Sequence, residues 1–266
     1  MSLPPVLQIR DLQYSFGKTA VIEGLSFELK RGEILAMIGP NGVGKTTALR
    51  LISGVIPMDS QNGSGIVHFL GQDFFELDPT ERAKRVVYIS GEVKTEFPLK
   101  AYELVQLGRV HSRASFISDL SEEDQNKIRE AMELCGCWGL RNREYSQLSG
   151  GEKQLVCFAR GLAQGAKVLL LDESFSRLDL QHQSRVGQLL RELTLQGYAF
   201  IWVSHDLNFV LEYSTSCLIW PAQGPATQGS VQDVINDSQI RKLYPGARVF
   251  TGKNPKTGSM NLFFDR

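Results

Sequence analysis

The first 90 residues contain several apolar segments typical of strands, interrupted by one segment typical of a helix. The segment from Leu7 to Phe16 ends at the turn-forming pair Gly17-Lys18, which indicates a strand followed by a tight turn. A helix is expected from Lys45 to Ile52, because Gly54 stands where helices commonly end. Strands are expected at 7–16, 25–29, 34–38, 66–70 and 86–89.

Between residues 91 and 165 the pattern is helical and rich in Glu, Arg and Lys. Helices are expected at 101–108, 122–134 and 152–163. Alternation then returns, with strands expected at 168–171, 198–203 and 217–220 and helices at 182–195 and 206–212. This order predicts an α/β fold with a mainly parallel sheet and an inserted helical block. The Gly-, Pro- and Lys-rich tail after Tyr244 predicts a loop or a weakly ordered extension, with a strand packed through Phe263 and Phe264 as the alternative.

Composition places the chain among ordinary globular proteins. Of its 266 residues, 42% are hydrophobic and 22% charged, and 29 basic residues balance 29 acidic ones. A zero net charge argues against a general nucleic-acid binder, which needs a basic footprint. No apolar stretch approaches the roughly 18 residues of a membrane span, and the amino terminus has no signal-peptide pattern. The four cysteines fit no zinc spacing, so we expect reduced thiols in a soluble intracellular protein.

The first chemical motif is Gly39-Pro-Asn-Gly-Val-Gly-Lys-Thr46, which matches G-x-x-x-x-G-K-[ST]. It follows an expected strand and opens an expected helix, the setting of a phosphate-binding loop. The glycines let backbone N–H groups converge on phosphate oxygens, and the helix dipole adds positive charge there. Lys45 is expected to reach the β- and γ-phosphates and the Thr46 hydroxyl to bind Mg²⁺. The sequence therefore predicts a binding site for ATP and Mg²⁺.

The second motif is the apolar strand Val168–Leu171, which ends in Asp172 and Glu173. Open α/β sheets place their ligands at the carboxyl ends of strands, so both carboxylates are expected beside the phosphate loop. Asp172 is predicted to hold Mg²⁺, and Glu173 to polarise the attacking water.

A third motif, Leu148-Ser149-Gly150-Gly151-Glu152, opens a helix. Ser149 can cap that helix, and the glycines expose N–H groups, so this is a second anion-binding terminus. One nucleotide does not need two such sites within one chain.

These three motifs resemble the nucleotide-binding subunit of ABC transporters, whose signature is of the LSGGQ type, from about Leu7 to Tyr244. The resemblance implies that Tyr14 stacks on adenine, that Asp179 belongs to the D-loop and that His205 is the switch histidine. It also implies a homodimer closed head to tail, with ATP between the phosphate loop of one subunit and the signature of the other. The implied nucleotide-binding residues are Tyr14, Gly39, Asn41, Gly42, Gly44, Lys45, Thr46, Thr47, Ser149, Gly150, Gly151 and Asp179. Thr46 and Asp172 are the implied metal ligands, and Glu173 and His205 the implied catalytic residues.

The family's domain plan implies a P-loop NTPase core with an N-terminal antiparallel β subdomain and an inserted α-helical subdomain. Residues 1–90 and 166–245 are expected to form the ATP-binding core with its antiparallel β subdomain. Residues 91–165 are expected to form the helical signature subdomain, and residues 246–266 a C-terminal extension.

The chain departs from the family pattern at the junction with the helical subdomain. Gly91 occupies the place of a glutamine that usually touches Mg²⁺ and the attacking water, and the adjacent Glu92 is the candidate substitute. Basal hydrolysis is expected to survive this change, and Gly91→Gln is expected to have a modest effect. Milder departures are Ser174 in place of proline and Glu152 in place of glutamine.

The segments 101–109 and 172–183 resemble bacterial importer ATPases for iron–siderophore, haem and cobalamin-type ligands. The resemblance implies a peripheral subunit on the cytoplasmic face, bound to membrane permease subunits and through them to a substrate-binding protein, with no nucleic acid. Two alternatives stay open: a soluble ABC ATPase of the iron–sulfur assembly type, and a degenerate cassette that binds ATP but barely hydrolyses it. The retained Glu173 and His205 argue against the degenerate cassette.

Overall fold

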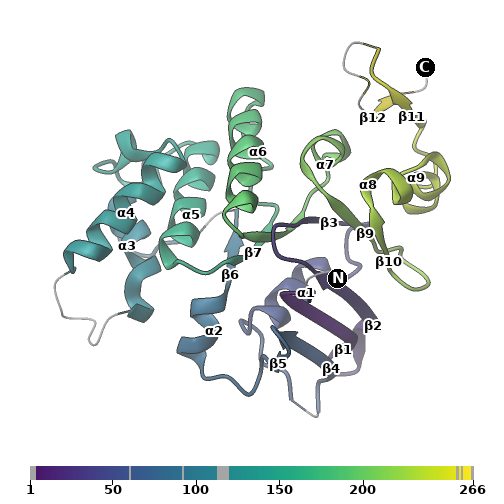
Figure 1. Cartoon of the computed structure of the whole chain (residues 1–266), viewed down its shortest axis with the longest axis horizontal. Helices are drawn as coiled ribbons and strands as arrows, with labels where there is room; N and C mark the ends of the chain where they lie inside the picture. The colour runs from purple at the N-terminus through teal and green to yellow at the C-terminus, as the bar shows by residue number, and fades with distance from the viewer. Residues whose placement is uncertain are drawn as a thin grey trace.

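The computed structural model describes residues 4–59, 61–91, 93–112, 120–255, 258 and 260–264. An antiparallel sheet of four strands forms the amino-terminal part, in the order β2-β1-β4-β5 (Figure 1). These strands are β1 (Leu7–Phe16), β2 (Thr19–Leu29), β4 (Gly63–Phe69) and β5 (Gln72–Asp73). The expected strand at 25–29 is therefore the second half of a longer strand, which pairs with β1 along its whole length.

The central sheet has six strands in the order β10-β9-β3-β8-β7-β6. Its strands are β3 (Ile34–Ile38), β6 (Val86–Ser90), β7 (Val168–Asp172), β8 (Ala199–Val203), β9 (Ser216–Ile219) and β10 (Thr227–Ser230). All neighbours pair in parallel except β10, which runs antiparallel to β9. Strands β3, β7 and β8 are buried at every position, so they read as continuous apolar runs.

Each face of the central sheet contributes to a different hydrophobic core. Successive side chains of β3 point to opposite faces, so Leu35 and Met37 pack with the antiparallel sheet while Ala36 packs with the helical side. Helix α1 (Lys45–Ile52) buries Leu49 and neighbouring side chains in the first of these cores. The antiparallel sheet and α1 therefore cover one face of the central sheet.

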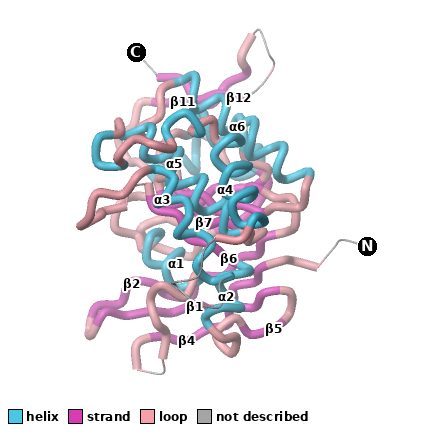
Figure 2. The backbone as a smooth tube through the Cα atoms, turned by 90° about the vertical axis from the view of Figure 1, so that its left-hand side faces the viewer, coloured by secondary structure: helices cyan, strands magenta, loops and turns pink. Residues whose placement is uncertain are grey.

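Helices cover the other face. Within the described part of residues 91–165 every regular element is helical: α3 (Ala101–Gln106), η1 (Leu107–Ser112), α4 (Glu122–Leu134), η2 (Trp138–Leu140), η3 (Tyr145–Gln147) and α5 (Gly150–Gln164). Figure 2 shows α3, α4 and α5 together above the antiparallel sheet, in front of β6 and β7. Helix α5 packs closely on β6 at Gly161. A Cβ at this position would lie 2.2 Å from Cδ1 of Ile89, so the contact needs glycine. The short α2 (Pro79–Arg85) leads into β6.

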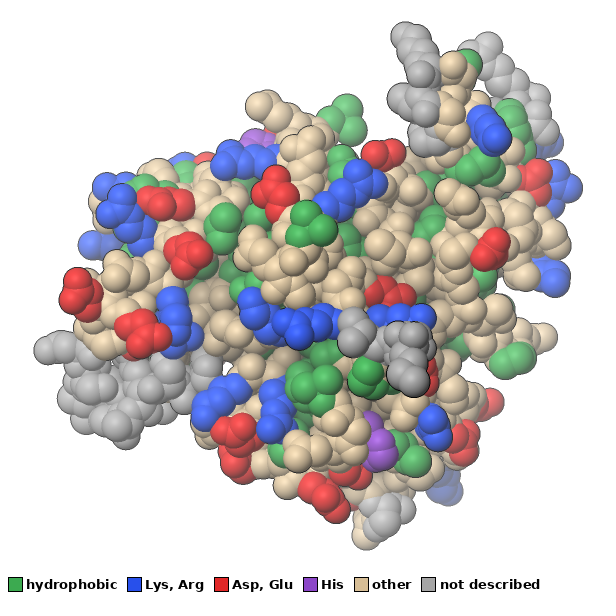
Figure 3. Space-filling model, in the orientation of Figure 1, with side chains coloured by type: hydrophobic (Ala, Val, Ile, Leu, Met, Phe, Trp, Pro, Cys, Tyr) green, Lys and Arg blue, Asp and Glu red, His purple; other side chains and the backbone are tan. Residues whose placement is uncertain are grey.

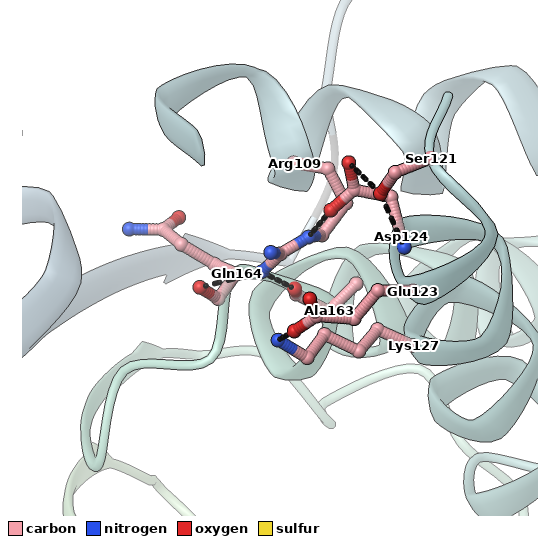
Figure 4. Close-up of polar contacts among 7 residues, drawn as sticks. All are labelled: Arg109, Ser121, Glu123, Asp124, Lys127, Ala163 and Gln164. Carbon is pink, nitrogen blue, oxygen red and sulfur yellow. Dashed lines mark hydrogen bonds and ion pairs between the residues drawn. The ribbon is translucent and has the colours of Figure 1, made fainter. Parts of the chain in front are cut away.

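A buried ion pair joins three elements of this helical block (Figure 4). Nε of Arg109, from η1, lies 2.7 Å from Oδ1 of Asp124 in α4, and both residues are less than 10% exposed. The Arg109 guanidinium also donates to the carbonyl oxygens of Ala163 and Gln164 at the end of α5. The hydroxyl of Ser121 donates to the second oxygen of Asp124. Such pairing offsets the cost of burying two charges.

The carboxyl-terminal part contains α6 (Leu180–Leu195), α7 (Leu207–Tyr213), α8 (Val231–Val234) and α9 (Asp237–Leu243). The expectation of a loop after Tyr244 is wrong, because β11 (Val249–Lys253) and β12 (Met260–Phe264) form an antiparallel hairpin, and the alternative of a strand that includes Phe263 and Phe264 agrees with β12. Side-chain bonds dock it: Asn208 of α7 bonds both backbone groups of Leu262, and Asp237 of α9 accepts from Thr251. The expected α/β fold, with its antiparallel sheet and inserted helices, is confirmed.

Candidate active site

The phosphate-binding loop joins the carboxyl end of β3 to α1. At two of its glycines the loop lies so close to neighbouring backbone that a side chain would not fit. A Cβ at Gly39 would lie 2.2 Å from the carbonyl oxygen of Trp220. A Cβ at Gly44 would lie 2.8 Å from the carbonyl oxygen of Val21, and Gly44 has a φ of 107°. The loop therefore needs glycine at both positions, and its tip, which includes Gly42, stays exposed.

Lys45 is the first residue of α1, and its ammonium lies inside the loop. Nζ donates to the carbonyl oxygens of Gly39 and Pro40 at 2.7 and 2.9 Å. The residue is 7% exposed, and this burial lowers its pKa, against the opposing effect of the carboxylates of Glu173 and Asp172. The loop thus holds a buried cation at the place where the sequence predicts phosphate.

Asp172, at the carboxyl end of β7, lies beside the start of α1. Its Oδ1 accepts a 3.0 Å bond from the hydroxyl of Thr46, and its Oδ2 accepts a 2.7 Å bond from the hydroxyl of Tyr88. Burial raises the pKa of Tyr88 to about 12, so its hydroxyl stays a donor at neutral pH. Nε of Arg50 donates to the same hydroxyl at 3.2 Å. Thr46 and Asp172 thus bring together hard oxygen donors of the kind that Mg²⁺ prefers, and Thr47 lies in the same helical turn.

Glu173 and His205 come from the carboxyl ends of neighbouring strands, β7 and β8, and form a contact pair. Oε1 of Glu173 lies 3.0 Å from Nε2 of His205, and both residues border a cavity of about 270 Å³. Glu173 has a φ of 49°, an uncommon backbone conformation for a residue other than glycine. Strain of this kind, at a carboxylate paired with histidine, is typical of functional sites.

Gly91 and Gln154 face each other in a second cavity of about 300 Å³, which Thr46, Asp172 and Glu173 also line. A Cβ at Gly91 would lie 3.3 Å from Nε2 of Gln154. Gln154 is 2% exposed, and its Oε1 accepts from the backbone N–H of Arg177 at 3.0 Å. No role for Gln154 could be predicted from the sequence. Its place in the signature helix, three residues after Gly151, is the signal that points to it.

Two departures from the family pattern have local structural roles. The hydroxyl of Ser174 donates a 2.9 Å hydrogen bond to the carbonyl oxygen of Ile89. This bond joins the segment after β7 to β6. Glu152 completes a capping box with Ser149, and the backbone N–H of Ser149 lowers the pKa of the Glu152 carboxyl. Glu92, the candidate substitute for the missing glutamine, lies outside the described residues.

The signature residues line a cavity separate from that of Asp172. Ser149, Gly150, Gly151 and Asp179 border this third cavity, of about 400 Å³. The hydroxyl of Ser149 accepts from the N–H of Glu152 and caps α5. The carboxylate of Asp179 caps α6, because it accepts from the N–H of His182, and that bond lowers its pKa. Within one chain, the signature and the phosphate loop are therefore not in the same cavity.

The structure contradicts the assignment of Tyr14 as the ring that stacks on adenine. Tyr14 is 5% exposed and packs in the core between the two sheets, so no face of its ring is free for a base. Phe16 is 52% exposed, and its ring lies 5.0 Å from that of Tyr14 in an edge-on arrangement. Phe16 is therefore the aromatic residue with a ring face free to stack on a base. Its place directly before the Gly17 turn is the signal in the sequence that points to this role.

The fold and the site together define a P-loop nucleotide-hydrolysing cassette with a signature helix. The family model described as ABC transporter matches residues 22–176. The hemin import ATP-binding protein HmuV of Escherichia coli O157:H7 is 32% identical over 98% of this chain and 100% of its own length. The HmuV protein of Deinococcus radiodurans is 35% identical, over 81% of this chain and 80% of its own. The chain belongs to the ABC transporter family and is an ATP-binding, ATP-hydrolysing subunit.

Solved structures have the same fold. A chain of a metal-chelate type ABC transporter in an inward-facing conformation superposes with a TM-score of 0.82, at 23% identity over 98% of this chain and 97% of its own. An ATP-binding cassette of an ABC transporter in its ADP conformation gives 0.79, at 22% identity over 92% of this chain and 100% of its own. None of the helices formed by the described residues has the length and apolarity that crossing a bilayer requires.

Proposed function

We propose that two copies of this chain close head to tail on ATP and Mg²⁺ and power import of a metal chelate of the haem type through membrane permease subunits. The observation that carries the proposal is the Glu173–His205 pair, 3.0 Å apart, at the same sheet edge as Lys45 and Asp172. Relatives named hemin import proteins support the substrate class.

Each residue has a part in hydrolysis. Lys45 would neutralise phosphate charge from inside the loop. Thr46 and Asp172 would hold Mg²⁺, which would supply charge screening for the β- and γ-phosphates. Glu173 accepts a hydrogen bond from the attacking water and orients it. His205 contacts Oε1 of Glu173 through its Nε2 and so aligns the carboxylate. As the switch histidine that the family resemblance implies, it would also face the γ-phosphate. Tyr88 holds Asp172 in place through its hydroxyl.

The separate cavity of the signature supports the dimer. The start of α5, at Ser149 and the two glycines after it, is a helix terminus suited to anionic phosphate. In the described part of the chain it borders a different cavity from that of Asp172. A second copy, placed head to tail, would give this terminus the γ-phosphate of the partner's nucleotide. Asp179, at the border of the same cavity, would then lie at the interface.

The importer role places the chain at the cytoplasmic face of the membrane as a peripheral subunit. Permease subunits would dock beside residues 91–109, at the junction of the central sheet and the helical block, and a substrate-binding protein would act through them. The domain division proposed from the sequence, at residues 90–91 and 165–166, assigns this junction to the helical signature subdomain. Co-purification of a polytopic membrane protein supports the importer, whereas a complex formed with soluble proteins alone favours the iron–sulfur assembly alternative.

Glu173→Gln tests the catalytic assignment. The amide keeps the shape of the side chain but cannot act as the acceptor that activates water, so this variant is expected to bind ATP, accumulate as a dimer and hydrolyse slowly. Gel filtration with ATP and Mg²⁺ measures the dimer, and phosphate release measures turnover. Glu192→Gln, on the exposed face of α6, is the control. Wild-type turnover in Glu173→Gln would place the catalytic residue elsewhere.

A further inference from the structure

A groove of about 390 Å³ lies at the edge of the central sheet opposite the active site. It is formed where parallel strands begin: Arg31 precedes β3, Arg85 precedes β6 and Lys167 precedes β7. The phosphate loop, Asp172 and Gly91 all follow the carboxyl ends of the same strands. Its volume is within the range of small-molecule sites, and its position separates it from the nucleotide.

The floor of the groove is apolar. Val6 and Phe69 are each 7% exposed, whereas Leu70 is 62% exposed. Leu70 and Gly71 have φ values of 48° and 82° and form the tight turn between β4 and β5. Such a turn favours Asn or Asp before the glycine. A strained and exposed leucine therefore stands where the fold itself favours a polar residue.

The rim of the groove is basic. Figure 3 shows a band of Lys and Arg side chains across the middle of one face of the molecule, with hydrophobic side chains below it. Arg31, Lys84, Arg85 and Lys167 line the groove. Among the described residues, Glu81 is the carboxylate that pairs with this group, at 2.7 Å from Lys84 and 3.7 Å from Arg85. Four cations thus face one carboxylate.

Arg85 has an unsatisfied donor at this place. Its Nη1 is buried and has no hydrogen-bond partner among the described residues, and its guanidinium lies over the Phe69 ring, 5.7 Å from the centroid. A buried guanidinium nitrogen without an acceptor is costly, so native proteins rarely leave one unpaired. A rotation of the Arg85 side chain toward the groove would let an acceptor from a ligand complete its hydrogen bonding.

We propose that this groove binds an amphiphilic carboxylate, a free carboxylic acid with an aliphatic chain. The carboxylate would pair with the exposed part of the Arg85 guanidinium and with Lys167 and Arg31, and the chain would cover Phe69 and Leu70. An inorganic anion would leave the apolar floor uncovered, and an uncharged alkane would leave Arg31 and Lys167 without the carboxylate partner that Lys84 and Arg85 have in Glu81. The proposal is independent of the transported substrate.

Isothermal titration of the full-length protein with decanoate tests the proposal, with decanol and acetate as the uncharged and the short ligand. Saturable binding of decanoate at one site, unchanged by Mg²⁺ and ATP, is expected, with decanol and acetate at least about tenfold weaker. Equal binding of acetate, or loss of decanoate binding when ATP is present, would overturn the proposal. So would absence of decanoate binding below its solubility limit.

Two variants locate the site. Arg85→Gln is expected to weaken decanoate binding about tenfold by removing the charged donor. Leu70→Asn gives the turn its favoured residue, so it keeps the fold while it removes the apolar contact, and it is expected to weaken binding severalfold. Lys127→Gln, on α4, is the matched charge control. Equal decanoate affinity in Leu70→Asn and wild type would overturn the proposal, and so would binding to phosphatidylglycerol vesicles in place of decanoate.

Discussion

The amide of Gln154 lies against Gly91, so close that a Cβ at position 91 would be 3.3 Å from its Nε2 and 3.0 Å from the carbonyl oxygen of Glu173. These separations are tighter than ordinary van der Waals contact. The glycine therefore does more than omit the family's glutamine: it leaves room for Gln154 beside the segment that carries the catalytic carboxylate.

We expect Gly91→Gln to lower the ATPase rate about tenfold, which is more than the modest effect expected from the sequence. The new Cβ pushes on Glu173, and small displacements of a reacting group are costly. Gly91→Ala, which adds the Cβ alone, is expected to cause most of that loss. Gly139→Ala is the control, because no heavy atom lies within 4 Å of its Cβ position. A faster rate in Gly91→Gln than in Gly91→Ala would show that the added amide assists catalysis.

Phe16→Ala is expected to weaken ATP binding about tenfold, because aromatic stacking on a base contributes about 1–3 kcal/mol. Its effect on the free energy of unfolding should be small, since the ring is 52% exposed. Tyr14→Ala should do the reverse, losing about 3 kcal/mol of stability through a core cavity. Calorimetric titration with ATP and urea unfolding measure the two quantities. Loss of ATP affinity in Tyr14→Phe, which keeps the core filled, would restore Tyr14 as the stacking residue.

Tyr88→Phe removes the hydroxyl that donates to Oδ2 of Asp172 at 2.7 Å. The carboxylate then loses a positioning contact, so the Mg²⁺ concentration for half-maximal ATPase activity should rise about tenfold. The maximal rate at saturating Mg²⁺ should change less. Tyr102→Phe, on α3, is the control. An unchanged Mg²⁺ dependence would mean that Thr46 alone is enough to hold Asp172.

Asp124→Ala should lower the free energy of unfolding by about 3–5 kcal/mol, because Arg109 is left buried without its carboxylate. Glu133→Ala breaks an exposed pair with Arg129 in the same helix and should cost less than about 1 kcal/mol. Urea unfolding followed by circular dichroism compares the two. Similar losses in both variants would show that burial does not govern the strength of the Arg109 pair.

The sequence by itself determined the elements whose information is local. The phosphate loop could be predicted because Gly39, Gly44 and Lys45 are fixed by backbone geometry and phosphate chemistry over a few residues. The strand before Asp172 could be predicted because a strand buried on both faces is apolar at every position. The capped start of the signature helix at Ser149 was likewise readable from the residues themselves.

Only the tertiary structure decided which side chains meet. Tyr14 and Phe16 are two residues apart on one strand and look alike in the sequence, but the packing of the two sheets buries the first and exposes the second. The hairpin after Tyr244 depends on partners in α7 and α9 that no local pattern reveals. Gln154 approaches Gly91 because α5 packs on β6. The two residues are more than sixty positions apart in the sequence, so their contact depends on the packing of the core and not on the local pattern of either segment.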